Sequence, residues 1–276
     1  LYVVATPIGN LRDITLRALD VLRSVDIVAA EDTRHTRKLL SAQDIHKTMI
    51  SFHAKSTQKQ LDRLLSFLSE GQDIAYVTDA GAPGVSDPGS LLVDAAREGG
   101  FEVTAIPGAS ALVVAIATAG LRADDFRFIG FLPRGRGKQH TLLSNALADG
   151  YAIALYESPS RIRALLELLS EIAPTRRVAL CRELTKLHEE VLRGAPCELL
   201  GTLPEKPRGE FTVLIERGVS EQDSSESLTK EELLHRARGL REKGLSTREV
   251  SEQLVQLTSM KKKEIYRLIV DDESGV

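Results

Sequence analysis

Short, continuously apolar runs alternate with amphipathic stretches along the first half of the chain. The apolar runs are LYVVA from Leu1, DIVAAED from Asp26, IAYVTD from Ile74 and FEVTAIPG from Phe101. Between them lie stretches with helical periodicity, such as TLRALDVLRSV from Thr15 and LLVDAAREGG from Leu91. Strands that are apolar on both faces are typical of a parallel sheet covered by helices on both sides. The pattern therefore predicts a parallel α/β domain over residues 1–120.

The pattern pauses between Gly120 and Asp124 and then resumes with a second set of apolar runs. These are FRFIGFLP from Phe126, YAIALYES from Tyr151, RVALCREL from Arg177 and EFTVLIER from Glu210, with helical stretches such as RIRALLELLSEI between them. We therefore expect a second α/β domain over residues 121–218. The apolar run from Ala111 to Leu121 is too short to span a bilayer and is predicted to be a buried helix.

A stretch rich in Ser, Glu and Asp follows the second domain. Its composition is typical of a linker, which we place at residues 219–227. Beyond it, residues 228–276 are predicted to form a small helical module with a helix–turn–helix pattern over 244–270. Capping-box spacings within it are Thr229 with Glu232 and Ser246 with Glu249.

The basic charge of the chain is concentrated in this module. The whole chain has a net charge of −3, whereas residues 228–270 contain ten Lys or Arg and six Asp or Glu and so carry +4. Basic charge on a helix–turn–helix pattern favours contacts with nucleic-acid phosphates. Lys261, Lys262 and Lys263 are the candidate contacts, and a solvated helix face is the alternative.

The two cysteines, Cys181 and Cys197, have a spacing that fits neither a disulfide framework nor a metal site. No basic and then apolar leader opens the sequence. We therefore expect a protein of a reducing compartment, the cytoplasm. His35, His53 and His140 also lack the spacing of metal ligands, so no metal site is expected.

Three segments at the predicted strand ends are rich in glycine and proline. They are TPIGN from Thr6, TDAGAPGVSDPGS from Thr78 and IPGASAL from Ile106. Ligands of open α/β sheets bind beyond the carboxyl ends of the strands. Glycine allows close backbone approach and proline fixes the backbone, so such loops suit a flat ligand held by main-chain groups. The alternative is three well-formed turns between strands and helices.

The class of ligand is narrowed by two motifs that the sequence lacks. No G-x-x-x-x-G-K-[ST] motif occurs, which argues against a P-loop nucleotide hydrolase, and no G-x-G-x-x-G follows the first strand, which argues against a standard NAD site. A nucleoside cofactor without phosphates, such as S-adenosylmethionine, fits these loops better. Its adenine can pair with main-chain groups, and its sulfonium favours nearby carbonyl or carboxylate oxygens.

Seven segments together carry a resemblance to a known family. LYVVATPIGNLRDIT, EDTR at Glu31, VTDAGAPGVSDPG, IPGASAL, GFLPRG, YESPSR and ELTKLHEE occur in this order. They resemble the tetrapyrrole-methylase superfamily of S-adenosylmethionine-dependent methyltransferases and, within it, the bacterial 16S ribosomal RNA (cytidine-2′-O)-methyltransferases. The resemblance covers essentially the whole chain.

The resemblance implies two α/β domains with the cofactor in the cleft between them, and usually a homodimer. It implies methylation of the ribose 2′-hydroxyl of a cytidine in the decoding region of 16S rRNA in the small ribosomal subunit. The C-terminal module, and a first loop less rich in glycine, favour this RNA branch over the porphyrin branch. A methyltransferase acting on a tetrapyrrole and a non-catalytic RNA-binding assembly factor are the alternative functions.

The resemblance also implies which residues bind the cofactor. Tyr156, Glu157 and the GEFTV strand would close the pocket from the second domain. Asp79 would bind the methionine amino group or a ribose hydroxyl, or cap its own turn, whereas Asp87 is interpreted as a helix cap. Gly9 would meet a substrate phosphate or simply form the turn. The predicted cofactor residues are Pro7, Gly9, Asp79, Gly81, Ala82, Pro83, Pro107, Gly108, Ala109, Ser110, Ala111, Tyr156, Phe211 and Thr212.

Methyl transfer to a hydroxyl needs an in-line arrangement of oxygen, methyl carbon and sulfur, and a proton acceptor assists it. Charged or titratable side chains that follow predicted strands are Glu31, Asp32, Arg34, Glu157, Glu183, Lys186, His188 and Glu189. Surface charges and ordinary ion pairs are the alternative for each. We select Asp32 and Glu157 as catalytic residues, and Arg34 as a residue that grips an RNA phosphate.

Leu132–His140 is predicted to be a flexible basic loop in which Arg134, Arg136 and Lys138 meet RNA phosphates, with a solvated loop as the alternative. An aromatic content of 4% leaves few stacking platforms, so we expect recognition of a folded RNA surface. Because Cys181 lies within an apolar run, thiolate attack on a pyrimidine carbon is not expected. Acidic residues at several strand ends could instead orient and deprotonate a hydroxyl, and the family resemblance implies that the methyl acceptor is a ribose oxygen.

Overall fold

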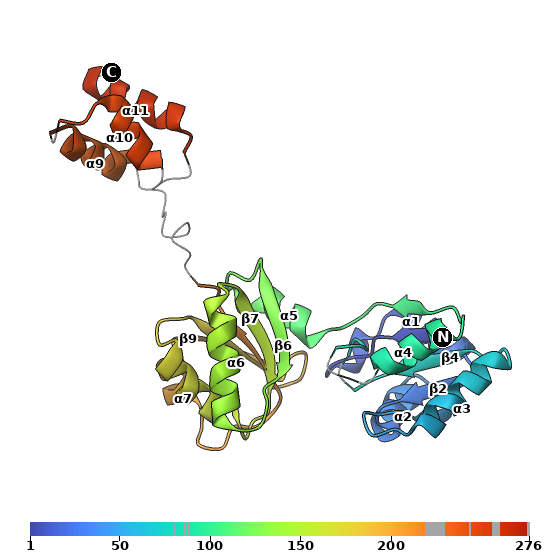
Figure 1. Cartoon of the computed structure of the whole chain (residues 1–276). Helices are drawn as coiled ribbons and strands as arrows, with labels where there is room; N and C mark the ends of the chain where they lie inside the picture. Colours follow the sequence, from blue (N-terminus) through green and yellow to red (C-terminus); the bar gives the residue numbers. More distant parts are fainter. Residues whose placement is uncertain are drawn as a thin grey trace. The chain divides into compact units, whose positions relative to one another are not determined.

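The chain divides into two compact units in the computed structural model, Leu1–Arg217 and Gly218–Val276. The structure describes residues 1–79, 81–85, 87, 89–218, 230–242, 244–255 and 260–274. The predicted linker, residues 219–227, and the cap residue Thr229 lie outside this described part. The first unit contains two five-stranded sheets, and the described residues of the second unit are mainly helical (Figure 1).

The first sheet is parallel throughout and has the strand order β3-β2-β4-β1-β5. One face packs against α1 and α2 through residues such as Leu22, and the other packs against α3 and α4 through residues such as Leu64. The prediction of a parallel sheet covered on both faces is confirmed for this half. Its strands are β1 (Tyr2–Val4), β2 (Ile27–Ala30), β3 (Thr48–Ser51), β4 (Ile74–Val77) and β5 (Thr104–Ile106), and its helices are α1 (Leu16–Ser24), α2 (Thr33–Ala42), α3 (Gln58–Ser69) and α4 (Gly89–Glu98), with a 3-10 turn at Leu11–Asp13.

The strand order places a topological switch point between β4 and β1. From β1 the chain passes to β2 on one side, and from the neighbouring β4 it passes to β5 on the other side. Such a point opens a crevice at the carboxyl ends of the two strands, where ligands of open α/β sheets bind. The glycine- and proline-rich loops after β1 and β4 both begin there.

The second sheet is mixed and has the order β6-β7-β10-β8-β9. The last strand, β10, lies at its centre and runs antiparallel to both neighbours. The expected second α/β domain carried no strand direction, because an apolar run reports that both faces of a strand are covered and does not report its direction. The strands are β6 (Phe126–Phe131), β7 (Ala152–Glu157), β8 (Val178–Arg182), β9 (Glu190–Gly194) and β10 (Phe211–Ile215).

Helices cover both faces of the second sheet. Side chains of α6 (Arg136–Ala148), α7 (Ile162–Ile172) and α8 (Pro196–Thr202) share one core cluster with alternate strand residues, and Figure 1 shows α6 along that face. On the other face, α5 (Ala111–Ala119) packs through Ala115 and Ala119 against small residues such as Ala154 and Ala179. We had expected α5 within the first domain, residues 1–120, but its packing places it with the second sheet.

Two other segments differ from the sequence expectation. The edge strands β3 and β9 were not expected, since they are short and only partly buried and so carry no clear apolar run. The predicted flexible loop over Leu132–His140 is only partly a loop, because α6 begins at Arg136 and buries Leu143 and Leu147. Arg136 and Lys138 therefore lie in the first turn of a helix.

The second unit contains α9 (Lys230–Glu242), α10 (Thr247–Leu254) and α11 (Lys262–Ser274). Their apolar faces form a separate small core that includes Leu233, Val250 and Ile265. The predicted capping box of α10 is present, because the Ser246 amide donates to the Glu249 carboxylate at 2.8 Å and the Ser246 hydroxyl accepts from the Glu249 amide. Among the described helices, none combines the length and the apolar character that crossing a membrane requires.

Candidate functional site

A cavity of about 400 Å³ lies within the first unit and is lined by residues that follow strands of both sheets. Ile8 after β1, Glu31 after β2, Asp79 after β4 and Ala111 at the start of α5 contribute from the first half of the unit. The second sheet contributes Phe131, Tyr156, Glu157, Ser158, Pro159, Cys181, Leu184, Glu210, Phe211 and Thr212. Because β10 is antiparallel, Phe211 pairs with Glu157 and Arg182, which brings these strand ends to one edge of the sheet.

The charged residues that line this cavity are all acidic. They are Glu31, Asp79, Glu157 and Glu210, and no Lys, Arg or His is among the described lining residues. Burial raises the pKa of the Glu31 carboxyl, a hydrogen bond from the Asp79 backbone opposes this, and the charges of Asp79 and Asp87 act in the same direction as burial. Glu157 and Glu210 are paired with Arg161 and Lys186, so Glu31 and Asp79 supply the negative charge that favours a cationic ligand over one that carries phosphates.

The loops after β1 and β4 are held to each other by hydrogen bonds. The Thr6 hydroxyl donates to the Thr78 carbonyl at 2.8 Å, and the Thr6 amide donates to the Gly81 carbonyl at 3.0 Å. Gly81 has a φ of +87°, and a Cβ atom there would lie 2.5 Å from Ile8 Cγ2 and 2.8 Å from the Ala109 carbonyl oxygen. The absence of a side chain at Gly81 is thus already required by the packing of the three loops against each other.

Gly9 is also explained by contacts within the chain. A Cβ atom at Gly9 would lie 2.5 Å from Lys186 Cγ and 2.8 Å from Thr185 Oγ1. The neighbouring Asn10 amide donates to Thr185 Oγ1 at 3.1 Å. The first loop therefore contacts the connection between β8 and β9, a role that differs from both roles considered for Gly9 from the sequence.

Some of the predicted cofactor residues line the cavity, namely Asp79, Ala111, Tyr156, Phe211 and Thr212. The other predicted residues lie in the three glycine- and proline-rich loops but are not among the described lining residues. They are Pro7, Gly9, Gly81, Ala82, Pro83, Pro107, Gly108, Ala109 and Ser110. Their role in cofactor binding stays a prediction. Asp87 behaves as the expected cap, since it accepts from the Gly89 amide at the start of α4 and from the Gly84 amide.

The cavity has an aromatic wall, of which the sequence predicted Tyr156 but not Phe131. Phe131 and Tyr156 both line the cavity with ring centroids 5.7 Å apart, and Phe128 packs behind Tyr156 at 5.0 Å. Phe131 lies in the GFLPRG segment, which contributes to the family resemblance. A phenylalanine in an apolar strand does not indicate which face of the sheet it occupies.

Asp32 is held by Arg34. The Arg34 guanidinium donates to both Asp32 oxygens, at 2.6 Å for the shortest contact, and the Arg34 amide donates to Asp32 Oδ1 at 2.8 Å. These hydrogen bonds hold the pKa of the Asp32 carboxyl well below its usual range. Asp32 also caps α2. A carboxylate in this state is a poor proton acceptor, and Arg34 already has an acidic partner.

Glu157 lines the cavity, but its side chain is only 1% exposed. One carboxylate oxygen accepts from the Ser158 amide at 2.8 Å, and the other lies 3.2 Å from the Arg161 guanidinium. Glu183, Lys186 and Glu189 are engaged in a similar way. Lys186 Nζ donates to Glu183 at 2.9 Å and to Glu210 at 2.8 Å, the Glu189 carboxylate accepts from the Thr185 amide, and His188 is exposed.

The predicted RNA-contact residues differ in their availability. Arg136 pairs with Glu171, and Lys262 pairs with Glu252, so their charges are partly neutralised. Arg34 is likewise paired with Asp32, and the other predicted contacts are exposed side chains, namely Arg134, Lys138, Lys261 and Lys263.

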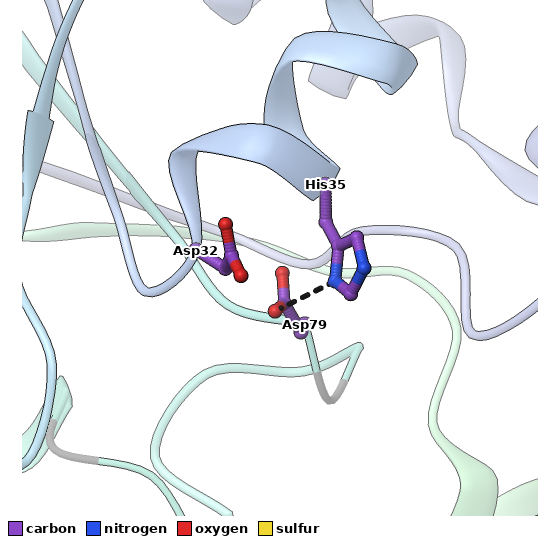
Figure 2. Close-up of side chains that lie close together, drawn as sticks. All are labelled: Asp32, His35 and Asp79. Carbon is purple, nitrogen blue, oxygen red and sulfur yellow. Dashed lines mark hydrogen bonds and ion pairs between the residues drawn. The ribbon is translucent and has the colours of Figure 1, made fainter.

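Figure 2 shows a group of side chains that the spacing along the chain does not reveal. Asp32 and His35 lie at the start of α2, and Asp79 approaches them from the loop after β4. The possible ligand atoms of these three residues all lie within 4.8 Å of one another, a donor set that could hold a divalent cation. His35 Nδ1 lies 3.0 Å from Asp79 Oδ2. The sequence prediction of no metal site rested on local spacing and could not register this approach.

Comparison with known proteins places the chain among methyltransferases. A family model described as Tetrapyrrole (Corrin/Porphyrin) Methylases matches residues 1–199. The chain is 41% identical over 276 residues to the Ribosomal RNA small subunit methyltransferase I of Synechocystis, a match covering 99% of this chain and 98% of that protein. A protein of the same name from Thermotoga maritima is 44% identical over 216 residues, which cover 78% of this chain and 97% of the relative.

Solved structures have the same fold. The methyltransferase CobJ matches with a TM-score of 0.60 at 21% identity, over 79% of this chain and 94% of that one. A uroporphyrin-III C-methyl transferase from Thermus thermophilus, complexed with S-adenyl homocysteine, matches with a TM-score of 0.55 at 18% identity, over 77% and 95% of the two chains.

Proposed function

The chain belongs to the tetrapyrrole (corrin/porphyrin) methylase family and is a methyltransferase, and on this premise we propose that it transfers the methyl group of S-adenosylmethionine to ribosomal RNA of the small subunit. The observation that carries the proposal is the acidic cavity at the carboxyl ends of the strands. Its position at the switch point fits a nucleoside, and its charge fits a sulfonium and an ammonium group.

The residues present fit this cofactor. A volume of about 400 Å³ is within the range of small-molecule sites. Phe131 and Tyr156 offer aromatic surface to the adenine, and Asp79 and Glu31 offer carboxylates to the amino group or the ribose hydroxyls. When bound, the cofactor supplies an activated methyl group. The protein supplies the orientation of the acceptor oxygen, the exclusion of water and a path for the proton.

The proposed acceptor is the ribose 2′-oxygen of a cytidine in the decoding region of 16S rRNA. The names of the relatives support ribosomal RNA as the substrate class, and the family resemblance supports the nucleotide. Cys181 lines the cavity, but burial raises the pKa of its thiol to about 11, so it does not supply a thiolate for attack on a pyrimidine carbon. This argues against methylation of a pyrimidine carbon.

The proposal extends to the partners. Arg134, Lys138, Lys261 and Lys263 would contact RNA phosphates, since their side chains are exposed. The protein would act in the cytoplasm on the small ribosomal subunit, as a homodimer. The resemblance of the sequence to the family supports the dimer, and the molar mass from light scattering would test it.

The test of function locates the transferred methyl group chemically. The full chain is incubated with S-adenosylmethionine labelled in the methyl group and with 16S rRNA, either free or in the small subunit, and 23S rRNA serves as the control. Alkali cleaves RNA through attack of the 2′-oxygen on the adjacent phosphorus, and methylation of that oxygen blocks cleavage. We expect the label in an uncleaved dinucleotide from 16S rRNA alone.

Other positions of the label would contradict the proposal in different ways. Label in mononucleotides would mean methylation of a base. Label transferred to a tetrapyrrole acceptor but to no RNA would favour the porphyrin branch. Cofactor binding without transfer to any of these acceptors would favour a non-catalytic assembly factor.

A further inference from the structure

His35 and Asp79 form a paired imidazole and carboxylate beside the cavity. His35 lies in the first turn of α2, and Asp79 follows β4, a neighbour of β2 in the first sheet. The two side chains meet with Nδ1 3.0 Å from Oδ2 (Figure 2). An ionised carboxylate only accepts hydrogen bonds, so the proton of a neutral ring is fixed on Nδ1. The other ring nitrogen, Nε2, is then an acceptor.

The pair lies at the boundary between the cavity and solvent. Asp79 lines the cavity together with Glu31 and Ala111, whereas the His35 side chain is 62% exposed. An RNA ribose that reaches a methyl group in this cavity must enter from solvent. A group that connects the cavity wall with bulk water can receive a proton from such a substrate and release it afterwards.

We propose that His35, oriented by Asp79, accepts the proton of the ribose 2′-hydroxyl during methyl transfer. This role rests on the proposed function. The 2′-oxygen forms a bond to the methyl carbon, the bond from that carbon to sulfur breaks, and its electron pair stays on sulfur to leave S-adenosylhomocysteine. The hydroxyl proton moves to His35 Nε2, and the imidazolium that forms is stabilised by the Asp79 carboxylate until water removes the proton.

The other candidates for the proton acceptor are less suited. Asp32 is neutralised by Arg34, which holds its pKa low. Glu157 is buried, accepts a hydrogen bond from the Ser158 amide and forms an ion pair with Arg161. Glu31 is the strongest rival, since it lines the cavity and burial raises the pKa of its carboxyl. It is therefore tested beside His35.

A metal ion bound by Asp32, His35 and Asp79 is the second rival. The donor atoms are close enough, but the oxygens of Asp32 already accept three or more hydrogen bonds from Arg34. A divalent cation would have to displace this guanidinium and also the contact between His35 and Asp79. The observed contacts favour the pair over the metal.

The test compares single-turnover rates of methyl transfer to 16S rRNA at saturating cofactor and RNA between pH 5.5 and 9. The charged groups near His35 are Asp79 and Asp32, and Arg34 is paired with Asp32. In the native protein the rate should rise with pH as the proton acceptor becomes deprotonated. His35→Asn keeps a donor for Asp79 but no base, and should lower the rate by roughly a hundredfold or more and flatten the profile. The affinity for S-adenosylmethionine should change less than about twofold.

Two further variants separate catalysis from structure. Because His35 is exposed, added imidazole should restore part of the rate of His35→Ala. Asp79 is a positioning residue, and Asp79→Asn should lower the rate without flattening the pH profile, because His35 remains as the base but loses the carboxylate that orients its ring. His46→Asn is the matched control, since His46 is an exposed histidine whose carboxylate partner, Asp44, does not line the cavity, and it should behave as the native protein.

The result that would overturn the inference is a native rate and an unchanged profile in His35→Asn. A flattened profile in Glu31→Gln alone would assign the proton to Glu31 instead. Activity lost in EDTA and restored by Mg²⁺ or Mn²⁺ would assign the cluster to a metal. Absence of transfer to RNA by the native chain would refute the proposed function itself, which keeps the two failures distinct.

Discussion

At the wall of the cavity, Phe131 presents an aromatic ring that is 58% exposed although it belongs to a strand of the second sheet. An exposed ring in a soluble protein is informative when it borders a cavity, because its face is free to stack on a planar ligand. The neighbouring Tyr156 lies at a tilt of 57° and is partly buried. Phe131 is thus the side chain best placed to take the adenine.

Replacement of Phe131 by Ala should therefore weaken cofactor binding. Stacking of a base on an aromatic side chain contributes about 1–3 kcal/mol, so we expect the Kd for S-adenosylmethionine to rise roughly tenfold. Isothermal titration calorimetry would measure it. Phe126→Ala is the matched control, since Phe126 lies on the same strand, is 41% exposed and does not line the cavity. Equal affinities of the two variants would exclude stacking on Phe131.

Among the elements, β8 and β10 are connected by the Glu216 carboxylate. Glu216 follows β10, and its oxygens accept from Arg177, just before β8, at 2.6 and 2.8 Å. A third hydrogen bond comes from the Arg122 amide at 3.3 Å. The Arg177 contact lowers the pKa of the Glu216 carboxyl, whose side chain is 16% exposed. This residue links the central strand to the segment between α5 and β6.

Glu216→Gln should lower the free energy of unfolding at pH 7 by about 1 kcal/mol, a value reduced because Arg177 is largely exposed. The folded-state pKa lies below the unfolded value, so this stability is fully present above pH 4.5 and is lost as the pH falls through the lowered pKa. Urea unfolding followed by circular dichroism should show two curves that converge in acid.

The matched control is Glu171→Gln, because Glu171 pairs with Arg136 and both side chains are more than half exposed. Its effect should stay below about 0.5 kcal/mol. A difference between Glu216→Gln and the native protein that persists unchanged in acid would mean that packing, and not the charge of Glu216, is responsible.

The sequence predicted most of the strands, because each strand has its own apolar run. It did not predict the contacts between elements, because these depend on how the strands are ordered in the sheet. The apolar runs located eight strands, because burial on both faces leaves a continuous pattern. The direction of β10 was not encoded in that pattern. The Asp32–Arg34 pair spans two residues, but the His35–Asp79 pair spans forty-four and depends on the order β2-β4 in the sheet. Likewise, Gly81 was expected to face a ligand, whereas its nearest constraint is Ile8.

At the scale of the whole molecule, the first unit alone is about as long as the part of the chain that matches the shorter relatives. The first unit ends at Arg217 and so spans a share of the chain close to the 78% that matches nearly the full length of the Thermotoga maritima relative. A relative from Borrelia garinii is covered completely by a match to 80% of this chain. The second unit has its own core. Cofactor binding should therefore belong to the first unit alone.

A chain that ends at Gly218 should bind S-adenosylmethionine with an unchanged Kd but should bind 16S rRNA more weakly. Each lost phosphate contact lowers the steepness of the salt dependence by about one, so the loss in affinity should be largest at low salt. Filter binding over a range of salt concentrations would measure it. Equal salt slopes for the truncated and full chains would exclude the second unit as an RNA contact.

Single substitutions in the full chain should identify which lysines of the second unit contact RNA. Lys261→Gln and Lys263→Gln should each reproduce part of the lost affinity. Lys262→Gln is the control, since Lys262 pairs with Glu252 and should contribute less. An effect of Lys262→Gln equal to the others would indicate that this ion pair opens on the RNA.

The central place of β10 has a consequence for the synthesis of the protein. The ribosome makes this strand last in the first unit, yet β7 and β8 both pair with it. Until Phe211–Ile215 emerges, these two strands present unpaired edges, which are sites of aggregation. A product of premature termination before this strand would therefore lack one wall of the cavity and be a target for chaperones and proteases, so the nascent enzyme acquires its activity and its protection from degradation at the same step.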